Sequence, residues 1–270
     1  MRKCCVFLLC LPALGGCGGH YILTATDTLA PAGGEAPVVC RLQRNDFFVL
    51  ALAVDKALVR YSINGGPMRG VYTDELGYAG TTVNVPEEPG LYRLLIEHTD
   101  WETGDEAAVE KPLYVWDPDK PAVAVDMDCL PWLWPAAFPH ARTALQKLAG
   151  DANVLYLTRQ SASRHERAHA RLRAAGFPDG PILMWQRQRW HIVRGKYGIP
   201  RIVVESRLVN QLPLIKKTFA NLKTGVCDSS LAAKAFVEAG MDVVVIGGAE
   251  VKAGNVTRRQ SWKDLAEKGP

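Results

Sequence analysis

Three apolar stretches in the second half of the chain each end in a residue whose side chain can take part in chemistry. Asp126 and Asp128 follow the first stretch, Thr158 follows the second, and Asp228 follows the third. Short apolar runs of this kind predict buried parallel strands, and sites in open α/β sheets form just beyond the carboxyl ends of such strands. We therefore expect these carboxylates and this hydroxyl, which are far apart along the chain, to meet in one crevice.

The sequences around these residues resemble the motifs of haloacid dehalogenase-like phosphatases. Val123-Ala-Val-Asp-Met-Asp128 is similar to the first motif, Val154-Leu-Tyr-Leu-Thr158 to the second and Lys223-Thr-Gly-Val-Cys-Asp228-Ser to the fourth. The stretch from Leu155 to Pro181 is most similar to the branch that contains the lipin and phosphatidate phosphatase catalytic domains. The resemblance covers residues 121–248, and its specificity lies in the order and spacing of the motifs.

The resemblance implies Mg²⁺-dependent hydrolysis of a phosphate monoester through an aspartyl-phosphate. Asp126 would be the nucleophile, and Asp128 would protonate the leaving oxygen and later activate water. The Thr158 hydroxyl would donate a hydrogen bond to a phosphoryl oxygen. The Asp126 carboxylate, the Asp128 backbone carbonyl and Asp228 would hold Mg²⁺, a hard cation that prefers oxygen ligands.

The third motif of these phosphatases supplies a cation, normally a lysine at the start of a helix. Arg207 is the best candidate here because it lies 21 residues before the fourth-motif aspartate, whereas Lys216 and Lys217 lie closer to that aspartate. Two other positions depart from the family. Leu130 replaces a threonine that is common after the first motif, and Ala232 replaces a further acid after the fourth. The nucleophile, the acid/base residue and one further metal-binding carboxylate remain, but two polar residues that accompany them in the family are absent.

Simpler structural roles are open for the same residues. Asp126 and Asp128 could form a turn or cap a helix, and Thr158 could cap the segment that follows it. Asp228 could cap a helix that begins near Ser230. Spacing along the sequence does not separate these roles from the catalytic ones, since both place the same residues at strand ends.

A different metal motif competes with this interpretation. His165-Glu-Arg-Ala-His169 fits the His-Glu-x-x-His pattern, in which two histidines on one helix face bind zinc and the glutamate is a general base. The helix is rich in arginine and no third ligand is evident from the sequence. Zinc-dependent hydrolysis through His165 and His169 is nevertheless a separate hypothesis.

The cysteines do not form a disulfide scaffold. Cys40, Cys129 and Cys227 remain after the first 17 residues, and three is an odd number. Cys40 is expected to be a buried core residue. Cys129 and Cys227 stand next to Asp128 and Asp228, so they could form a bridge beside the site or remain as buried thiols.

The start of the chain resembles a bacterial lipoprotein signal. Met1-Arg-Lys precedes 11 apolar residues and then Leu14-Gly-Gly-Cys17, in which Cys17 would carry the lipid. Plain secretion and an uncleaved anchor are the alternatives. No later stretch reaches the length of a membrane helix. We therefore expect a lipid-anchored, extracytoplasmic protein of the bacterial cell envelope, facing the periplasm or the cell surface.

The sequence predicts four segments and two folded domains. They are a signal peptide with a lipobox over 1–17, a tether over 18–34, an immunoglobulin-like β-sandwich over 35–117, and a Rossmann-like, haloacid dehalogenase-like α/β domain with a parallel sheet over 118–270. Asp117-Pro-Asp-Lys-Pro121 forms the polar, proline-interrupted boundary between the two domains.

Charge changes sign at this boundary. Residues 31–119 contain 15 acidic and 7 basic side chains, whereas residues 120–270 contain 12 acidic and 23 basic ones. The second half should therefore attract anions over a distance.

Hydrophobic periodicity predicts the elements of each domain. Strands of the first are expected at 36–42, 47–58, 60–63, 80–85, 90–97 and 111–115. The second should contain strands at 121–126, 153–157, 181–184, 224–226 and 241–246, with helices at 140–149, 164–175, 206–219 and 230–239.

Two aromatic segments surround the expected site. Trp132, Trp134 and Phe138 could contact lipid or a hydrophobic substrate, or could pack against the β-sandwich. Residues 185–201 mix basic and aromatic side chains, which could bind a phosphorylated head group or nucleic acid, or could form a hairpin with a solvated basic face.

Taken together, the sequence favours a Mg²⁺-dependent phosphatase that acts on a phosphorylated small molecule or a phospholipid. Its other partner would be the membrane, reached through the lipid anchor, and no nucleic acid is expected. The alternative is an inactive domain of the same fold that serves as a binding module at the envelope.

Overall fold

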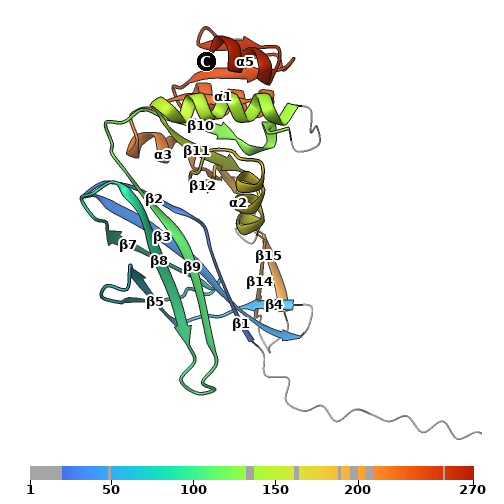
Figure 1. Ribbon diagram of the computed structural model, residues 1–270. Coiled ribbons are helices and arrows are strands. Elements are labelled where there is room, and N and C mark those ends of the chain that lie inside the picture. The colour runs from blue at the N-terminus through green and yellow to red at the C-terminus, as the bar shows by residue number, and fades with distance from the viewer. Residues whose placement is uncertain are drawn as a thin grey trace, which may run out of the picture.

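The computed structural model describes most of the chain and divides it into a β-sandwich and an α/β part (Figure 1). The described residues are 20–47, 50–131, 137–160, 164–187, 190–194, 200–204, 209–251 and 253–270. Within them no helix is long and apolar enough to cross a membrane.

The β-sandwich is built from two sheets that enclose one apolar core. One sheet has the order β2-β9-β8-β5-β6, and the other has β1, β3 and β4 side by side with β7 paired to β3. The strands are β1 (His20–Ala25), β2 (Thr28–Pro31), β3 (Glu35–Phe47), β4 (Leu50–Ala53), β5 (Leu58–Ile63), β6 (Arg69–Tyr72), β7 (Tyr78–Asn84), β8 (Gly90–Thr99) and β9 (Glu106–Trp116). Cys40 lies buried in this core, as predicted.

The tether predicted over residues 18–34 is wrong for residues 20–31. These residues form β1 and β2, and Leu23, Leu29 and Ala30 are buried. The segment pairs with β3 on one sheet and with β9 on the other. The sequence did not predict these strands, because the few residues that they bury stand among small and polar residues.

The α/β part has a six-stranded sheet that is parallel throughout, with the order β12-β11-β10-β17-β18-β19. Its strands are β10 (Ala122–Asp126), β11 (Asn153–Thr158), β12 (Ile182–Met184), β17 (Leu222–Cys227), β18 (Asp242–Ile246) and β19 (Val256–Arg259). The helices are α1 (Phe138–Asp151), α2 (His165–Ala174), α3 (Leu212–Thr218), α4 (Ser230–Glu238) and α5 (Trp262–Lys268), with a 3₁₀ turn η1 (Met127–Cys129) after β10. Parallel strands covered by helices confirm the predicted α/β class.

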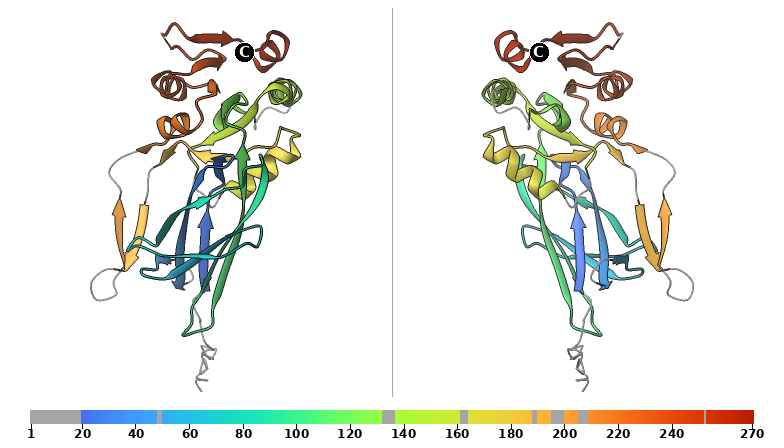
Figure 2. Two further views of the ribbon diagram at one scale, coloured as in Figure 1. Left: turned by 90° about the vertical axis from the view of Figure 1, so that its left-hand side faces the viewer. Right: turned by 90° about the vertical axis from the view of Figure 1, so that its right-hand side faces the viewer.

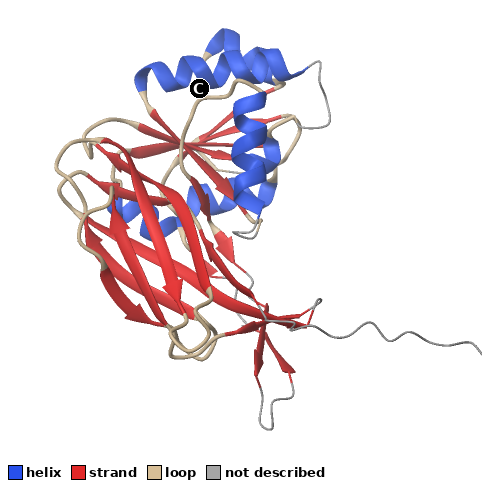
Figure 3. Ribbon diagram, turned by 60° about the horizontal axis from the view of Figure 1, so that its bottom comes forward, coloured by secondary structure: helices blue, strands red, loops and turns tan. Residues whose placement is uncertain are grey.

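Helices cover both faces of this sheet (Figure 3). Alternate residues of β10 point to opposite sides: Val123 and Val125 join a core with α1, α2 and α5, whereas Ala124 joins a core with α3 and α4. The second core also contains Leu29 and Tyr114 from the β-sandwich. The two parts of the chain therefore share an apolar core.

Polar contacts of α2 reinforce this junction. Lys111 of β9 donates to Glu166 at 3.0 Å, and a carboxylate oxygen of Asp27 lies 2.7 Å from the ring of His169. The same oxygen of Asp27 accepts the backbone N–H of Ile182 at 2.6 Å. Asp27 and Lys111 are both buried, so these contacts compensate charges that would otherwise be costly to bury.

Two predictions for the α/β part need correction. Within the described part of the helix predicted over 206–219, residues 209–210 are a short strand and the helix begins at Leu212, with a proline in its first turn. Proline is tolerated at the first helical position but not in the interior, which explains this late start. The sequence analysis predicted no element after the strand at 241–246, but β19 and α5 follow it.

A hairpin leaves the α/β part between β12 and α3 (Figure 2). It contains β14 (Trp190–Arg194) and β15 (Pro200–Val204), which pair antiparallel, while β13 (Gln186–Arg187) pairs with β16 (Val209–Asn210). The hairpin lies against β4 of the β-sandwich. The backbone therefore matches the hairpin alternative for this segment.

Gly225 allows α4 to pack closely against β17. A Cβ atom at this position would meet ring carbons of Phe236 at 2.5 and 2.6 Å, and that ring is buried. We expect Gly225→Ala to lower the free energy of unfolding by about 1–3 kcal/mol, because the core must rearrange. Gly150→Ala is the matched control, since nothing lies near a Cβ there and alanine favours a helix. Urea unfolding should show a lower free energy of unfolding for Gly225→Ala but not for Gly150→Ala. A Gly225→Ala variant as stable as the wild type would contradict the packing argument.

Candidate functional site

The register of the parallel sheet brings the predicted residues to one edge. Leu157 of β11 pairs with Asp126 at the end of β10, and Thr158 follows it. On the other side of β10, Asp228 stands two residues beyond the position that pairs with Val125. Because β11 and β17 both neighbour β10, the three strand ends lie next to one another at the carboxyl end of the sheet.

Asp126 is fully buried, and its two carboxylate oxygens differ. Oδ1 accepts the backbone N–H of Asp128 at 3.1 Å, whereas Oδ2 has no hydrogen-bond partner. Burial raises the pKa of Asp126 to about 6, and the charges of Asp128 and Asp228 add to the rise, while the Asp128 N–H and Arg159 oppose it. A buried carboxylate oxygen without a partner is costly, which marks this position as one that a bound group could stabilise.

Asp128 forms an ion pair with Arg159, a residue that the sequence analysis did not select. The Arg159 Nε atom lies 3.0 Å from Asp128 Oδ2, and the Nη2 atom contacts the same oxygen. Both side chains are partly exposed, at 41% for Arg159 and 34% for Asp128. Arg159 directly follows Thr158, so its place just beyond a strand end was the signal that could have identified it.

The other two predicted side chains lie on either side of Asp126. Thr158 is buried, and its hydroxyl oxygen accepts the backbone N–H of Gln160 at 3.0 Å, so it also has the capping role considered above. Asp228 lies at the exposed rim, where partial burial and then the charge of Asp128 raise its pKa. Asp228 does not cap α4; Ser229 does so by accepting the Ala232 N–H at 3.2 Å.

Both cysteines beside the site are buried free thiols. Burial raises the pKa of Cys227 to about 12 and the pKa of Cys129 well above its usual value, and the nearby charges of Asp126 and Asp228 add to both shifts. These thiols are therefore inert packing groups, and the predicted alternative of a bridge between them is not formed.

The oxygens at the strand ends are of the chemical type that a hard divalent cation prefers. The expected ligands are two carboxylates, Asp126 and Asp228, and the backbone carbonyl of Asp128. In the described part of the chain, no group of three or more His, Cys, Asp or Glu side chains is placed to hold a metal, but this ligand set contains only two side chains. The unpartnered Asp126 oxygen and the like charges around it are what a cation would compensate.

The zinc hypothesis is not supported. His169 pairs with Asp27, and Glu166, the proposed general base, pairs with Lys111. His165 is buried with both ring nitrogens unpartnered, and burial lowers its pKa. The contacts of Glu166 and His169 join this helix face to the β-sandwich.

Several predicted residues contribute elsewhere or lie outside the described ranges. Arg207, Cys17, Trp132 and Trp134 are among those outside. Phe138 is half-buried, its ring stacked on Phe177 with centroids 6.0 Å apart. Leu130 and Ala232, the two departures from the phosphatase pattern, are buried in the two cores.

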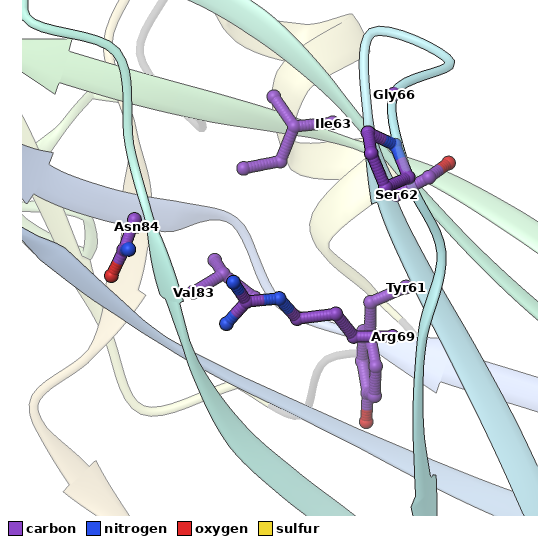
Figure 4. A pocket seen from close by; sticks show the side chains of 8 residues that line it. Tyr61, Ser62, Ile63, Gly66, Arg69, Val83 and Asn84 are labelled. Carbon is purple, nitrogen blue, oxygen red and sulfur yellow. The ribbon is translucent and has the colours of Figure 1, made fainter.

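Two surface hollows lie away from these carboxylates. The hollow in Figure 4 has a volume of about 180 Å³ and is lined by β-sandwich residues that include Tyr61, Arg69 and Asn84. A larger cleft of about 630 Å³ runs between the β-sandwich and α2, with Lys111 and His169 among its lining residues. Their linings do not include the strand-end carboxylates.

The buried charge of Asp126 makes stability depend on pH. The pKa of about 6 in the folded chain exceeds the usual 3.8, so the stability due to protonation is complete below pH 3.8 and is lost as the pH rises through 6. Asp126→Asn should therefore be more stable than the wild type at pH 8 without divalent metal, by up to about 3 kcal/mol, and the difference should shrink towards pH 4.5.

Thermal unfolding in a metal chelator between pH 4.5 and 8 measures this difference. Asp151→Asn, at the exposed end of α1, is the control for removal of a surface carboxylate. A difference between Asp126→Asn and the wild type that does not change with pH would contradict the buried-charge argument.

Comparison with known proteins assigns no family. No family model matches the chain, and no curated protein matches it. The chain is similar to a carbohydrate acetylesterase from Xanthomonas citri (12% identity, 88% of this chain and 70% of that one, TM-score 0.34). It is also similar to a family 123 glycoside hydrolase from Clostridium perfringens (10% identity, 82% and 60%, TM-score 0.21) and to a putative beta-galactosidase from Bacteroides fragilis (13% identity, 84% and 38%, TM-score 0.30). At these TM-scores the similarities support neither a fold assignment nor a function.

Proposed function

We propose that the chain is a Mg²⁺-dependent phosphate monoester hydrolase with a haloacid dehalogenase-like α/β domain. The observation that carries this proposal is the state of Asp126: a buried carboxylate with one unpartnered oxygen, at the end of a parallel strand, beside the charges of Asp128 and Asp228. Such a concentration of carboxylates favours a bound cation and a reaction with an electrophile.

The chain's own residues divide the reaction between them. An oxygen of Asp126 attacks phosphorus, and the bond from phosphorus to the ester oxygen breaks. Asp128 gives its proton to that leaving oxygen, and afterwards takes a proton from the water that hydrolyses the aspartyl-phosphate. The Asp128 backbone N–H fixes the orientation of the Asp126 carboxylate. Thr158, at the end of β11, lies beside the end of β10 that presents Asp126.

Asp126, Asp228 and the Asp128 carbonyl would hold the Mg²⁺ ion. When bound, the ion neutralises charge on the carboxylates and the phosphoryl oxygens, which lowers the barrier to approach of two anions. The basic character of residues 120–270 would also draw anionic substrates towards this domain. A phosphorylated small molecule and a phospholipid are both compatible with these features.

The same chain would be held at the bacterial envelope through lipid on Cys17. This proposal rests on the Leu14–Cys17 motif, which lies outside the described residues. A membrane-anchored phosphatase would meet phospholipid head groups directly, so lipid phosphates belong in any substrate panel.

An inactive binding module is the second candidate. The ion pair between Asp128 and Arg159 favours it, because this pair occupies the carboxylate that the reaction needs as an acid. Burial of Asp126 points the same way, since substrate must reach a side chain that has no exposed surface here. Turnover measurements separate the two candidates.

We expect the chain to hydrolyse an aryl phosphate only when Mg²⁺ is present. Asp126→Asn should reduce the rate by about a thousandfold or more, because the nucleophile is lost. Asp151→Asn should retain the wild-type rate. Release of phosphate from aryl, sugar and lipid phosphates is measured with Mg²⁺ and with a chelator. No release from any of the three would refute the enzymatic proposal and leave the binding module.

Binding of Mg²⁺ should stabilise the folded chain. At a concentration 100 times the dissociation constant the gain is about 2.7 kcal/mol. Asp126→Asn and Asp228→Asn should each reduce the shift in melting temperature, because each removes a carboxylate ligand. A shift of wild-type size in both variants would show that the ion binds elsewhere.

A further inference from the structure

Among the residues that the structure describes, Arg159 is the basic one that contacts the strand-end carboxylates. Its guanidinium contacts Asp128, and its charge acts on both Asp126 and Asp228. The hydrogen bond to Asp128, and then the charges of all three carboxylates, raise the pKa of Arg159. Arg159, at the end of β11, therefore offsets the negative charge of the acids at the ends of β10 and β17.

The chemistry at this edge needs such a cation. A phosphoryl group carries up to two negative charges and would approach three carboxylates, so its binding requires positive charge beyond one divalent ion. The third-motif cation expected from the sequence, Arg207, lies outside the described residues. Arg159, in contrast, is within hydrogen-bonding distance of the acid/base residue.

We propose that Arg159 is the phosphoryl-binding residue of this site and exchanges Asp128 for the phosphate of the substrate. This inference rests on the proposed function and assigns a residue within it. The guanidinium already directs Nε–H and an Nη2–H at one carboxylate oxygen, and the same two donors suit a phosphoryl oxygen. Both side chains are partly exposed, so the exchange requires rotation of an accessible side chain and leaves the core in place.

The exchange gives Asp128 two states. In the ligand-free chain Asp128 accepts hydrogen bonds from Arg159, and it then acts as an internal competitor for the phosphate-binding donors. When phosphate takes those donors, the Asp128 carboxylate is released and can take up from solvent the proton that it then gives to the leaving oxygen. The anionic part of the substrate would thus prepare the acid/base residue for its own reaction.

A static role is the competing interpretation. The pair would then only tie η1 to the end of β11, and Arg159 would take no part in binding. The two interpretations differ in one measurable quantity, the energetic coupling between residues 128 and 159 when phosphate binds.

The test is a double-variant cycle on the full chain, with inorganic phosphate as the probe and isothermal titration calorimetry as the measurement, with and without Mg²⁺. Arg159→Ala should weaken phosphate binding about tenfold to a hundredfold, because hydrogen bonds to a charged group are lost. Arg159→Lys should recover part of the affinity, since it keeps the charge but not the paired donors. Arg167→Ala, an exposed arginine of α2, is the control and should bind as the wild type does.

Asp128→Asn, made with and without Arg159→Ala, measures the energetic coupling between residues 128 and 159. Removing a negative charge would tighten phosphate binding to the same extent in both backgrounds if the pair were static. We expect Asp128→Asn to tighten binding several-fold more when Arg159 is present than in Arg159→Ala, because only then is a competitor removed. Thermal unfolding checks that every variant is folded.

The outcomes separate this inference from the proposed function. Coupled phosphate binding without hydrolysis of any phosphate ester would support the role of Arg159 and refute the enzyme. Hydrolysis with unchanged phosphate affinity in Arg159→Ala, or with equal effects of Asp128→Asn in both backgrounds, would overturn the role of Arg159 alone. Absence of phosphate binding to the wild type in the presence of Mg²⁺ would overturn it as well.

Discussion

A buried carboxylate placed beside two others is the constraint on which this structure depends. Asp126 has no exposed surface, and the charges of Asp128 and Asp228 make its ionised form still less favourable. Backbone register, rather than side-chain attraction, holds these groups together, because β10 lies between β11 and β17 in a hydrogen-bonded parallel sheet. The free energy of the apolar cores keeps like charges at one edge, where cations such as Arg159 can compensate them.

The β-sandwich contacts the α/β part directly and helps to hold its strands and helices in place. A single carboxylate oxygen of Asp27 receives the backbone N–H of Ile182 at the start of β12 and contacts His169 of α2. Trp116 at the end of β9 also stacks edge-to-face on Phe219, with ring centroids 5.7 Å apart. Since β11 lies between β12 and β10, the sandwich braces the side of the sheet that presents Thr158 and Arg159. The junction thereby connects the first half of the chain to the geometry of the candidate site.

The hydrophobic pattern of the sequence predicted an element correctly where that element buries many apolar residues, and it failed where few are buried. The strands that end at Asp126 and Thr158 are largely apolar runs, as expected for strands covered on both faces, whereas β17, which ends at Cys227, is apolar mainly in its second half. β1 and β2 were predicted to be a tether, because small and polar residues accompany the few that they bury. β19 was not predicted, because Val256-Thr-Arg-Arg259 at the edge of the sheet buries little.

The sequence by itself determined the α/β class of the second half and the all-β character of the first, and it placed Asp126, Thr158 and Asp228 at the ends of strands. Each of these follows from hydrophobic periodicity, which is written along the chain and read over a few residues. Only the tertiary structure decided which side chains become partners. It paired Arg159 with Asp128, left one oxygen of Asp126 without a partner, and used His169 to join two parts of the chain rather than to bind metal. Such choices depend on distance and burial between residues remote in sequence, so no local pattern encodes them.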